Sequence, residues 1–247
     1  MRILVLDVGG NNVKVRRSGS RGVTKIPSGP NMTAAAMARA VLAVASEWKY
    51  DAVTIGYPGP VAGNRPAREP HNLGGGWVRY DFAKAFRRPV RFVNDAAMQA
   101  LGSYEGGRML YLGLGTGLGS ALVVDGVLVP TELAHLPYRK GLTYEDYVGQ
   151  RGYERMGRAR WRQHVTEVVG RLRDALLVDY VVLGGGNVKR MERLPAGCVQ
   201  GSNGNAFKGG VRVWAMPRRA RRRAPVQSTG RQARRRTKRS TRARASR

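Results

Sequence analysis

Three glycine-rich segments each follow a run of apolar residues, and each could bind a phosphate group. They are DVGGNNVK (7–14), GLGTGLGS (113–120) and LGGGN (183–187). Turns of this kind can direct backbone N–H groups toward an anion. None of them matches G-x-G-x-x-G or G-x-x-x-x-G-K-[ST], so neither a Rossmann fingerprint nor a Walker loop is indicated. Three such turns in one chain indicate a nucleotide or polyphosphate site.

The second of these segments has glycine at every other position. In an extended strand, Gly113, Gly115, Gly117 and Gly119 would point the same way and leave one face bare. A bare face is typical of a glycine-rich hairpin turn, and also of a backbone that a ligand approaches closely. The spacing alone leaves both interpretations open.

Polar residues that could do acid–base chemistry lie near the middle of the chain. Asp95 lies two residues after the predicted strand PVRFV (89–93) and at the start of a helix, where it could be a general base or only a helix cap. Asn94 could cap the same helix. Glu132 and His135 are three residues apart, and by themselves each could be an ordinary polar residue.

Strands and helices are predicted to alternate along the chain. Apolar runs predict buried strands at 3–6, 52–57, 89–93 and 179–186, and amphipathic spacing predicts helices at 33–48 and 161–177. Asp125-Gly126 predicts a hairpin turn. Glycine-rich turns after strands are typical of α/β proteins that bind ligands at strand ends.

Composition narrows the class of protein. The chain has 247 residues with a net charge of +28, and a basic surface attracts polyanions. Its single cysteine, Cys198, excludes an internal disulfide framework and any multi-cysteine metal site. Since neither a signal peptide nor a membrane-spanning segment is predicted, we expect a cytoplasmic protein without membrane contact.

The last thirty residues differ from the rest. Of the 44 basic residues, 14 lie in 218–247, which contains no acid, so the remainder has 30 basic against 16 acidic side chains. This segment has too few apolar residues to form a core, and we expect it to be disordered. It is either a polyanion-binding tail, with nonspecific nucleic-acid contact, or a stretch read out of frame.

Six segments in order resemble the ROK family of sugar kinases, in the actin/hexokinase-like superfamily, and most closely its polyphosphate/ATP-dependent glucokinase branch. The resemblance runs from Ile3 to about Trp214 and is carried by DVGGNNVK, GYPGPV, HNLGGGW, VNDAAMQALG, GLGTGLGSALVVDGVLVPTELAH and LGGGN. It implies an α/β, two-domain actin-like (RNase H-like) ATPase fold with an interdomain cleft. The implied division is 1–105, 106–217 with the last helix packing back on the first domain, and the tail 218–247.

The resemblance also implies roles for individual residues. Asp95 would be the general base for a sugar hydroxyl. The sugar would be held by Asn72, Asn94, Glu132 and His135. The phosphates of the donor would be held by Asp7, Gly9, Gly10, Asn11, Lys14, Gly115, Thr116, Gly117, Gly184, Gly185 and Gly186. Asp7 would also bind Mg²⁺ through water, which fits the oxygen ligands that this ion prefers.

The chain departs from the family pattern at two site positions. Asn11 stands where the family has threonine, and Ala134 replaces the glycine of E-x-G-H. The cysteine cluster that binds zinc in many ROK proteins is absent, so no zinc is expected at His135.

The predicted function is therefore phosphoryl transfer from ATP, inorganic polyphosphate or both to the 6-hydroxyl of glucose or a similar hexose, with Mg²⁺ and by a homodimer. Two alternatives remain open from the sequence: a nucleic-acid-binding protein, and a ROK-fold protein that binds a sugar or phosphate without turnover. The basic tail is the only feature that favours the former, and Asn11 and Ala134 leave room for the latter.

Overall fold

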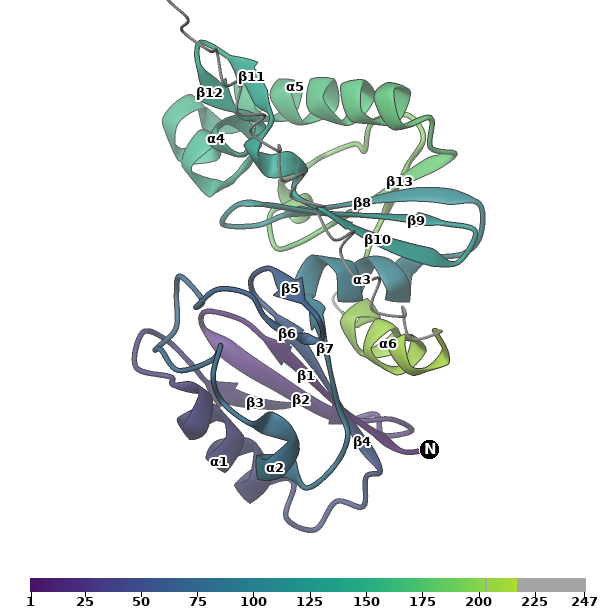
Figure 1. Cartoon of the computed structure of the whole chain (residues 1–247). Coiled ribbons are helices and arrows are strands. Elements are labelled where there is room, and N and C mark those ends of the chain that lie inside the picture. Colours follow the sequence, from purple (N-terminus) through teal and green to yellow (C-terminus); the bar gives the residue numbers. More distant parts are fainter. Residues whose placement is uncertain (203, 217–247) are drawn as a thin grey trace, which may run out of the picture. The chain divides into compact units, whose positions relative to one another are not determined.

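The computed structural model describes residues 1–202 and 204–216, and the predictions made for segment 218–247 lie outside these residues. The described chain contains two five-stranded sheets of the same topology (Figure 1). In each sheet an antiparallel three-stranded meander is followed by two parallel strands. The strand orders are β3-β2-β1-β4-β7 and β10-β9-β8-β13-β14.

The first sheet is formed by residues 3–94. In it β1 pairs antiparallel with β2 and parallel with β4, and β4 continues parallel to β7. Its strands are β1 Ile3–Val8, β2 Asn12–Arg17, β3 Thr24–Pro27, β4 Ala52–Tyr57 and β7 Val90–Asn94. All six residues of β1 and of β4 are buried, as expected for central strands covered on both faces.

The second sheet repeats this arrangement in residues 108–200. Here β8 pairs antiparallel with β9 and parallel with β13. Its strands are β8 Arg108–Leu114, β9 Leu118–Val124, β10 Val127–Thr131, β13 Tyr180–Gly184 and β14 Cys198–Gln200. Asp125 and Gly126 both have positive φ in the β9–β10 turn, which confirms the predicted hairpin.

The remaining elements are short strands and helices. Two small hairpins are β5 Val61–Ala62 with β6 Arg65–Pro66, and β11 Pro137–Arg139 with β12 Leu142–Thr143. The helices are α1 Ala34–Val44, α2 Phe82–Phe86, α3 Asp95–Ser103, α4 Tyr144–Val148, α5 Gln150–Leu176 and α6 Asn205–Arg212, with 3₁₀ turns η1 Leu133–His135, η2 Val188–Arg190 and η3 Val213–Ala215. No helix among the described residues is long and apolar enough to cross a membrane.

Local sequence explains where the helices begin. The Thr33 hydroxyl accepts a hydrogen bond from Ala36 N (3.2 Å) and caps α1, and Asn94 Oδ1 accepts from Ala97 N (3.1 Å) and caps α3. The predicted long helix is present but begins earlier than expected, at Gln150. It is kinked at Gly157, whose φ of 74° is outside the helical region.

Helices α3 and α6 pack on each other and share one apolar core with both sheets. This core includes Val5 of β1, Met98 of α3, Tyr111 of β8 and Phe207 of α6. The helix α6 is fixed to the first sheet by Thr54 of β4, whose hydroxyl donates to Gly210 O at 2.7 Å. Helix α3 contacts both sheets, and its first residues lie beside the C-terminal end of β4 and the N-terminal end of β9.

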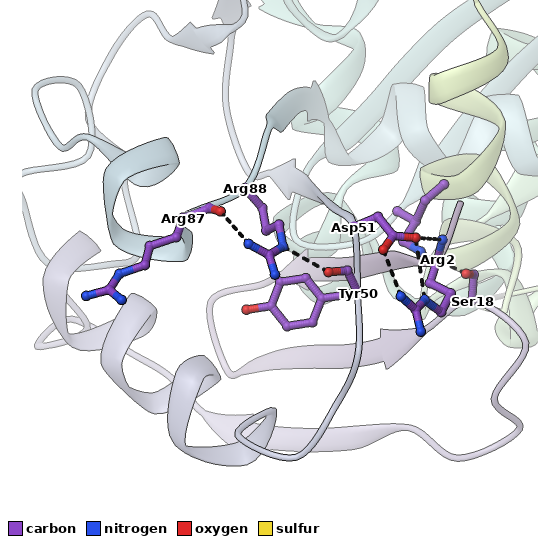
Figure 2. A network of polar contacts seen from close by, with 7 residues as sticks. Arg2, Ser18, Tyr50, Asp51, Arg87 and Arg88 are labelled. Carbon is purple, nitrogen blue, oxygen red and sulfur yellow. Dashed lines mark hydrogen bonds and ion pairs between the residues drawn. The ribbon is translucent and has the colours of Figure 1, made fainter.

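A polar network fixes the N-terminal ends of β1 and β4 (Figure 2). Arg2 donates to Asp51 from its backbone N–H at 2.7 Å and from its guanidinium at 2.9 Å. Beside it, Ile3 N donates to Ser18 Oγ at the end of β2 (2.8 Å). These contacts fix the register of the three strands, and they lie at the opposite end of β1 from Asp7.

Candidate active site

The first predicted phosphate turn joins β1 to β2. Asp7 is buried near the carboxyl end of β1, and its Oδ2 accepts from Lys14 Nζ at 2.9 Å across the hairpin. Gly9 N donates to Asn12 O (3.0 Å), which closes the turn, and Asn11 at its tip is exposed. The turn therefore offers one carboxylate, one ammonium group and backbone amides.

Asp95 is the first residue of α3 and follows β7 directly. Its Oδ1 accepts from Ala96 N at 2.8 Å, so the carboxyl group stays close to the helix N-terminus. The residue as a whole is half-buried, while its carboxyl group is surrounded by protein. Asn94 caps the helix and also donates to Gly59 O at 3.2 Å, which holds the β4–β5 connection against the start of α3.

The electrostatic surroundings of Asp95 bring three of the predicted site residues together. Burial is the main cause that raises the pKa of Asp95 to about 7. The Ala96 N–H opposes this shift, and the negative charges of Asp7 and Glu132 contribute to it. Burial also raises the pKa of Tyr111, with smaller contributions from Asp95 and Asp7. A carboxyl group with a pKa near neutrality can accept or donate a proton at physiological pH.

The glycine-rich segment 113–120 comprises the end of β8, the hairpin loop 115–117 and the start of β9. Its bare face is filled mainly by protein: Gly119 lies against Ala96, whose Cβ would be 2.9 Å from an added Cβ, and a Cβ at Gly117 would overlap the Glu145 carboxylate. Only Gly115 of the alternating glycines faces open space. Thr116 at the tip is exposed, and its carbonyl accepts from Gln150 N at 3.0 Å.

The third turn, at the end of β13, lies beside this loop. Gly186 faces open space, whereas a side chain at Gly184 or Gly185 would overlap β8 residues. Asn187 is buried, and its Nδ2 donates to Gly115 O at 2.9 Å and to Gln150 Oε1 at 3.1 Å. The second and third predicted phosphate turns are thus joined by one side chain.

The predicted sugar-binding residues are less closely connected. Asn72 is exposed but lies against the first turn, since its Cβ would be 3.2 Å from a Cβ added at Gly10. Glu132 and His135 are exposed at the two ends of η1, and His135 makes no hydrogen bond with another described residue. Ala134 between them is buried in the core, so its methyl group is accommodated by packing.

The sequence interpretation missed the residues that hold the loops in place. Glu145 accepts from Leu118 N at 3.0 Å, and Gln150 bonds both Asn187 and Arg190 (3.0 Å). Asn187 could have been found, because it ends the LGGGN segment. Glu145 and Gln150 lie in a stretch with no recognisable pattern, and only the fold places them.

No group of three or more His, Cys, Asp or Glu side chains that could together hold a metal ion occurs among residues 1–202 and 204–216. A magnesium ion that arrives with a phosphate donor needs only one or two protein carboxylates and keeps several waters. The buried carboxylate of Asp7 fits that requirement.

Two sheets of identical strand order, with helices α3 and α6 packed against them, define the actin-like fold. Several of the solved structures that the chain resembles in fold are ROK-family sugar kinases. An inorganic polyphosphate/ATP-glucomannokinase from Arthrobacter sp. strain KM matches with a TM-score of 0.73 and 23% identity over 87% of this chain and 98% of that one. A ROK family glucokinase from Streptomyces griseus, in complex with glucose and AMPPNP, matches with a TM-score of 0.66 and 16% identity over 86% and 99% of the two chains.

A third match is of a different kind. A ROK family transcriptional regulator, a homologue of the E. coli MLC protein, has a TM-score of 0.64 and 14% identity over 85% of this chain and 76% of that one. No family model and no curated protein matches the sequence. At these identities the comparisons establish the fold, and the activity is argued from the site.

Proposed function

We propose that the chain is a sugar kinase that transfers a phosphoryl group from ATP or inorganic polyphosphate to the 6-hydroxyl of glucose or a similar hexose. The observation that carries this proposal is the Asp95 carboxyl group, whose pKa is raised to about 7 by burial and by Asp7 and Glu132, at the start of a helix next to two glycine-rich hairpin turns. The polyphosphate/ATP-glucomannokinase and the glucokinase with the same fold support the substrate class.

In this mechanism Asp95 accepts the proton of the sugar 6-hydroxyl as its oxygen attacks the terminal phosphorus of the donor. The bond from that phosphorus to the bridging oxygen breaks, and ADP or a polyphosphate shorter by one unit leaves. Asn72, Asn94, Glu132 and His135 hold the sugar. A general base positioned in this way contributes about 10²- to 10⁴-fold to the rate.

The turns supply groups that stabilise the negative charge of the transferring phosphoryl group. Backbone N–H groups of Gly10, Thr116 and Gly117 would face the phosphates, and Lys14 adds a positive charge beside Asp7. The Gly9 N–H, expected to do the same, is instead used inside the turn, where it donates to Asn12 O. The turn at 184–186 holds the remainder of the donor. Magnesium, bound to Asp7 through water, would neutralise charge on the donor oxygens.

The test is formation of glucose 6-phosphate from glucose and Mg²⁺ with either donor, measured by a coupled dehydrogenase assay. We expect Asp95→Asn to lower kcat by about 10²- to 10⁴-fold. The matched control is Asp125→Asn, which changes an exposed aspartate in a hairpin turn where asparagine is equally suited to the positive φ, and it should leave kcat unchanged.

The pH dependence gives a second readout. Because Asp95 must be ionised to act as a base, kcat/KM should rise tenfold per pH unit below about pH 7 and level off above it. The folded-state pKa is raised, so ionisation also costs stability, and the free energy of unfolding should fall as the pH rises from about 4 through 7. At pH 8, Asp95→Asn should therefore be more stable than the parent chain by at least about 1 kcal/mol.

Two outcomes would contradict the proposal. Formation of product at an undiminished rate by Asp95→Asn would exclude Asp95 as the base. Absence of product with both donors, in a chain that still binds glucose, would favour the ROK-fold protein that binds without turnover.

A further inference from the structure

A pocket of about 350 Å³ lies away from the predicted site, between the end of β2 and one face of α6. Its cationic lining consists of Arg16, Arg17, Lys208 and Arg212, and no acidic residue lines it. Four positive charges around one small concavity repel each other, so an anion bound there would be favoured.

Two of these cations already have structural partners. Arg16 Nε donates to Ser20 O at 2.6 Å, and its guanidinium lies 5.5 Å from the centre of the Phe207 ring. Arg212 donates to Leu101 O (2.9 Å) and Tyr104 O (2.8 Å) at the C-terminal end of α3. These contacts hold both guanidinium groups in place at the pocket. Binding of an anion would therefore cost less side-chain conformational entropy.

The other two cations are uncompensated. Neither Arg17 nor Lys208 makes a side-chain hydrogen bond or ion pair with another residue of 1–202 and 204–216. Arg17 is half-buried and Lys208 is exposed, so both can reach a ligand from the rim. The Ser18 hydroxyl accepts from Ile3 N and keeps its own proton to donate.

The rest of the wall is apolar. Val5, Phe207 and Val211 line the pocket, and a Cβ at Gly210 would overlap Val5, so α6 lies directly on β1 there. An inorganic phosphate chain could use the cations but not this wall. A volume of 350 Å³ is at the lower end for small-molecule sites, which suits one ring system with one phosphate rather than a dinucleotide.

We propose that this pocket is a second binding site, distinct from the predicted phosphoryl-transfer site, which binds a nucleoside monophosphate by its phosphate to Arg17 and Lys208 and by its base to the Phe207 and Val211 wall. The helix that forms one side of it, α6, packs on α3 and on β1, which carry Asp95 and Asp7. Figure 1 shows α6 beside α3.

The test uses AMP, which cannot donate the phosphoryl group needed for turnover, and the isotopically labelled full chain. We expect AMP to shift the NMR signals of the Phe207 ring and of the α6 amides with a Kd below about 1 mM. Adenosine and inorganic phosphate, which each offer half of the recognised chemistry, should bind at least about tenfold more weakly.

The variant Arg17→Ala/Lys208→Ala should weaken AMP binding at least about tenfold. The matched control, Lys49→Ala/Arg79→Ala, removes the same charge from exposed positions that do not line the pocket and should bind AMP normally. Val211→Glu, which puts a carboxylate at the rim, should also weaken binding, and Asp95→Asn should not.

The proposal is overturned if AMP shifts no α6 signal, if adenosine or phosphate binds as well as AMP, or if the control double variant loses as much affinity as Arg17→Ala/Lys208→Ala. None of these outcomes bears on whether the chain phosphorylates glucose.

Discussion

The two sheets begin in the same way. In the first, Arg2 bonds Asp51 with its backbone N–H (2.7 Å) and its guanidinium (2.9 Å). In the second, Arg108 bonds Asp179 with the same two groups at 2.7 and 3.1 Å. Arg2 directly precedes β1 and Arg108 is the first residue of β8, and each aspartate directly precedes the neighbouring parallel strand. The same pair of contacts, here called the clamp, therefore occurs once in each sheet.

At their other ends the same strands differ. Asp7 pairs with Lys14 one step before the end of the β1–β2 ladder, and Gly113 pairs with Gly119 at the equivalent step of β8–β9. The space that a side chain at Gly113 would take is filled by the Tyr111 ring, which would lie 3.3 Å from an added Cβ. The Tyr111 hydroxyl donates to Gln99 Oε1 at 2.8 Å. The β1–β2 hairpin thus presents charged side chains to the site, whereas the β8–β9 hairpin presents its backbone and the buried phenol ring of Tyr111.

The largest expected effect comes from removing the charge that distinguishes the first hairpin. Asp7→Asn keeps the shape but loses the proposed magnesium contact, and we expect kcat/KM to fall by about 100-fold or more. The pKa of Asp95 should also fall below about 7, because the negative charge of Asp7 contributes to raising it. The Asp95 pKa is measured by carboxyl NMR titration. Activity within a few-fold of the parent chain would mean that the two hairpins do not differ in role.

A smaller effect, on stability, is expected at the two glycines of the neighbouring parallel strands that pair with Gly113 and Asp7. Gly184 pairs with Gly113, and a Cβ there would overlap the buried ring of Tyr111, so Gly184→Ala should lower the free energy of unfolding by about 1–3 kcal/mol. Gly56 pairs with Asp7, and a Cβ there would meet the flexible end of Met98. Gly56→Ala should therefore cost less. Urea unfolding of both variants tests this order, and equal or reversed costs would contradict it.

The smallest effects are expected at the repeated clamp. Arg2→Ala and Arg108→Ala each remove an exposed ion pair, so each should lower the melting temperature by less than about 4 °C, and by similar amounts. Added salt should reduce both effects. A large loss in one variant and none in the other would mean that the two clamps are not equivalent.

Local pattern was enough to predict several of the strands and helices. The strand 52–57 has the predicted bounds, and Asn94 is the cap of α3. The four alternating glycines do not lie on one strand: Gly113 is in β8, Gly115 and Gly117 are in the hairpin loop, and Gly119 is in β9. The spacing also could not show what lies against them, because Ala96 and Glu145 come from other parts of the chain. The prediction also missed the part of α5 before Trp161, which contains the kink at Gly157.

The sequence also contains an internal repeat that matches the two sheets. R-I-L-V-L-D (2–7) and R-M-L-Y-L-G (108–113) align without a gap, as do D-A-V-T-I-G (51–56) and D-Y-V-V-L-G (179–184). This alignment would have predicted both clamps and the equivalence of Asp7 with Gly113. The roles proposed for Glu132 and His135, and the division of the chain at residue 105, stay predictions.

The contact of α6 with β1 has a consequence for how the chain folds. The strand β1 is synthesised about two hundred residues before α6, the helix that covers Val5 and accepts a hydrogen bond from Thr54. Pairings this distant in sequence form late and slowly. During translation one apolar face of the first sheet therefore stays uncovered until α6 has been synthesised. A chain cut before residue 205 would keep that face exposed and would be prone to aggregate.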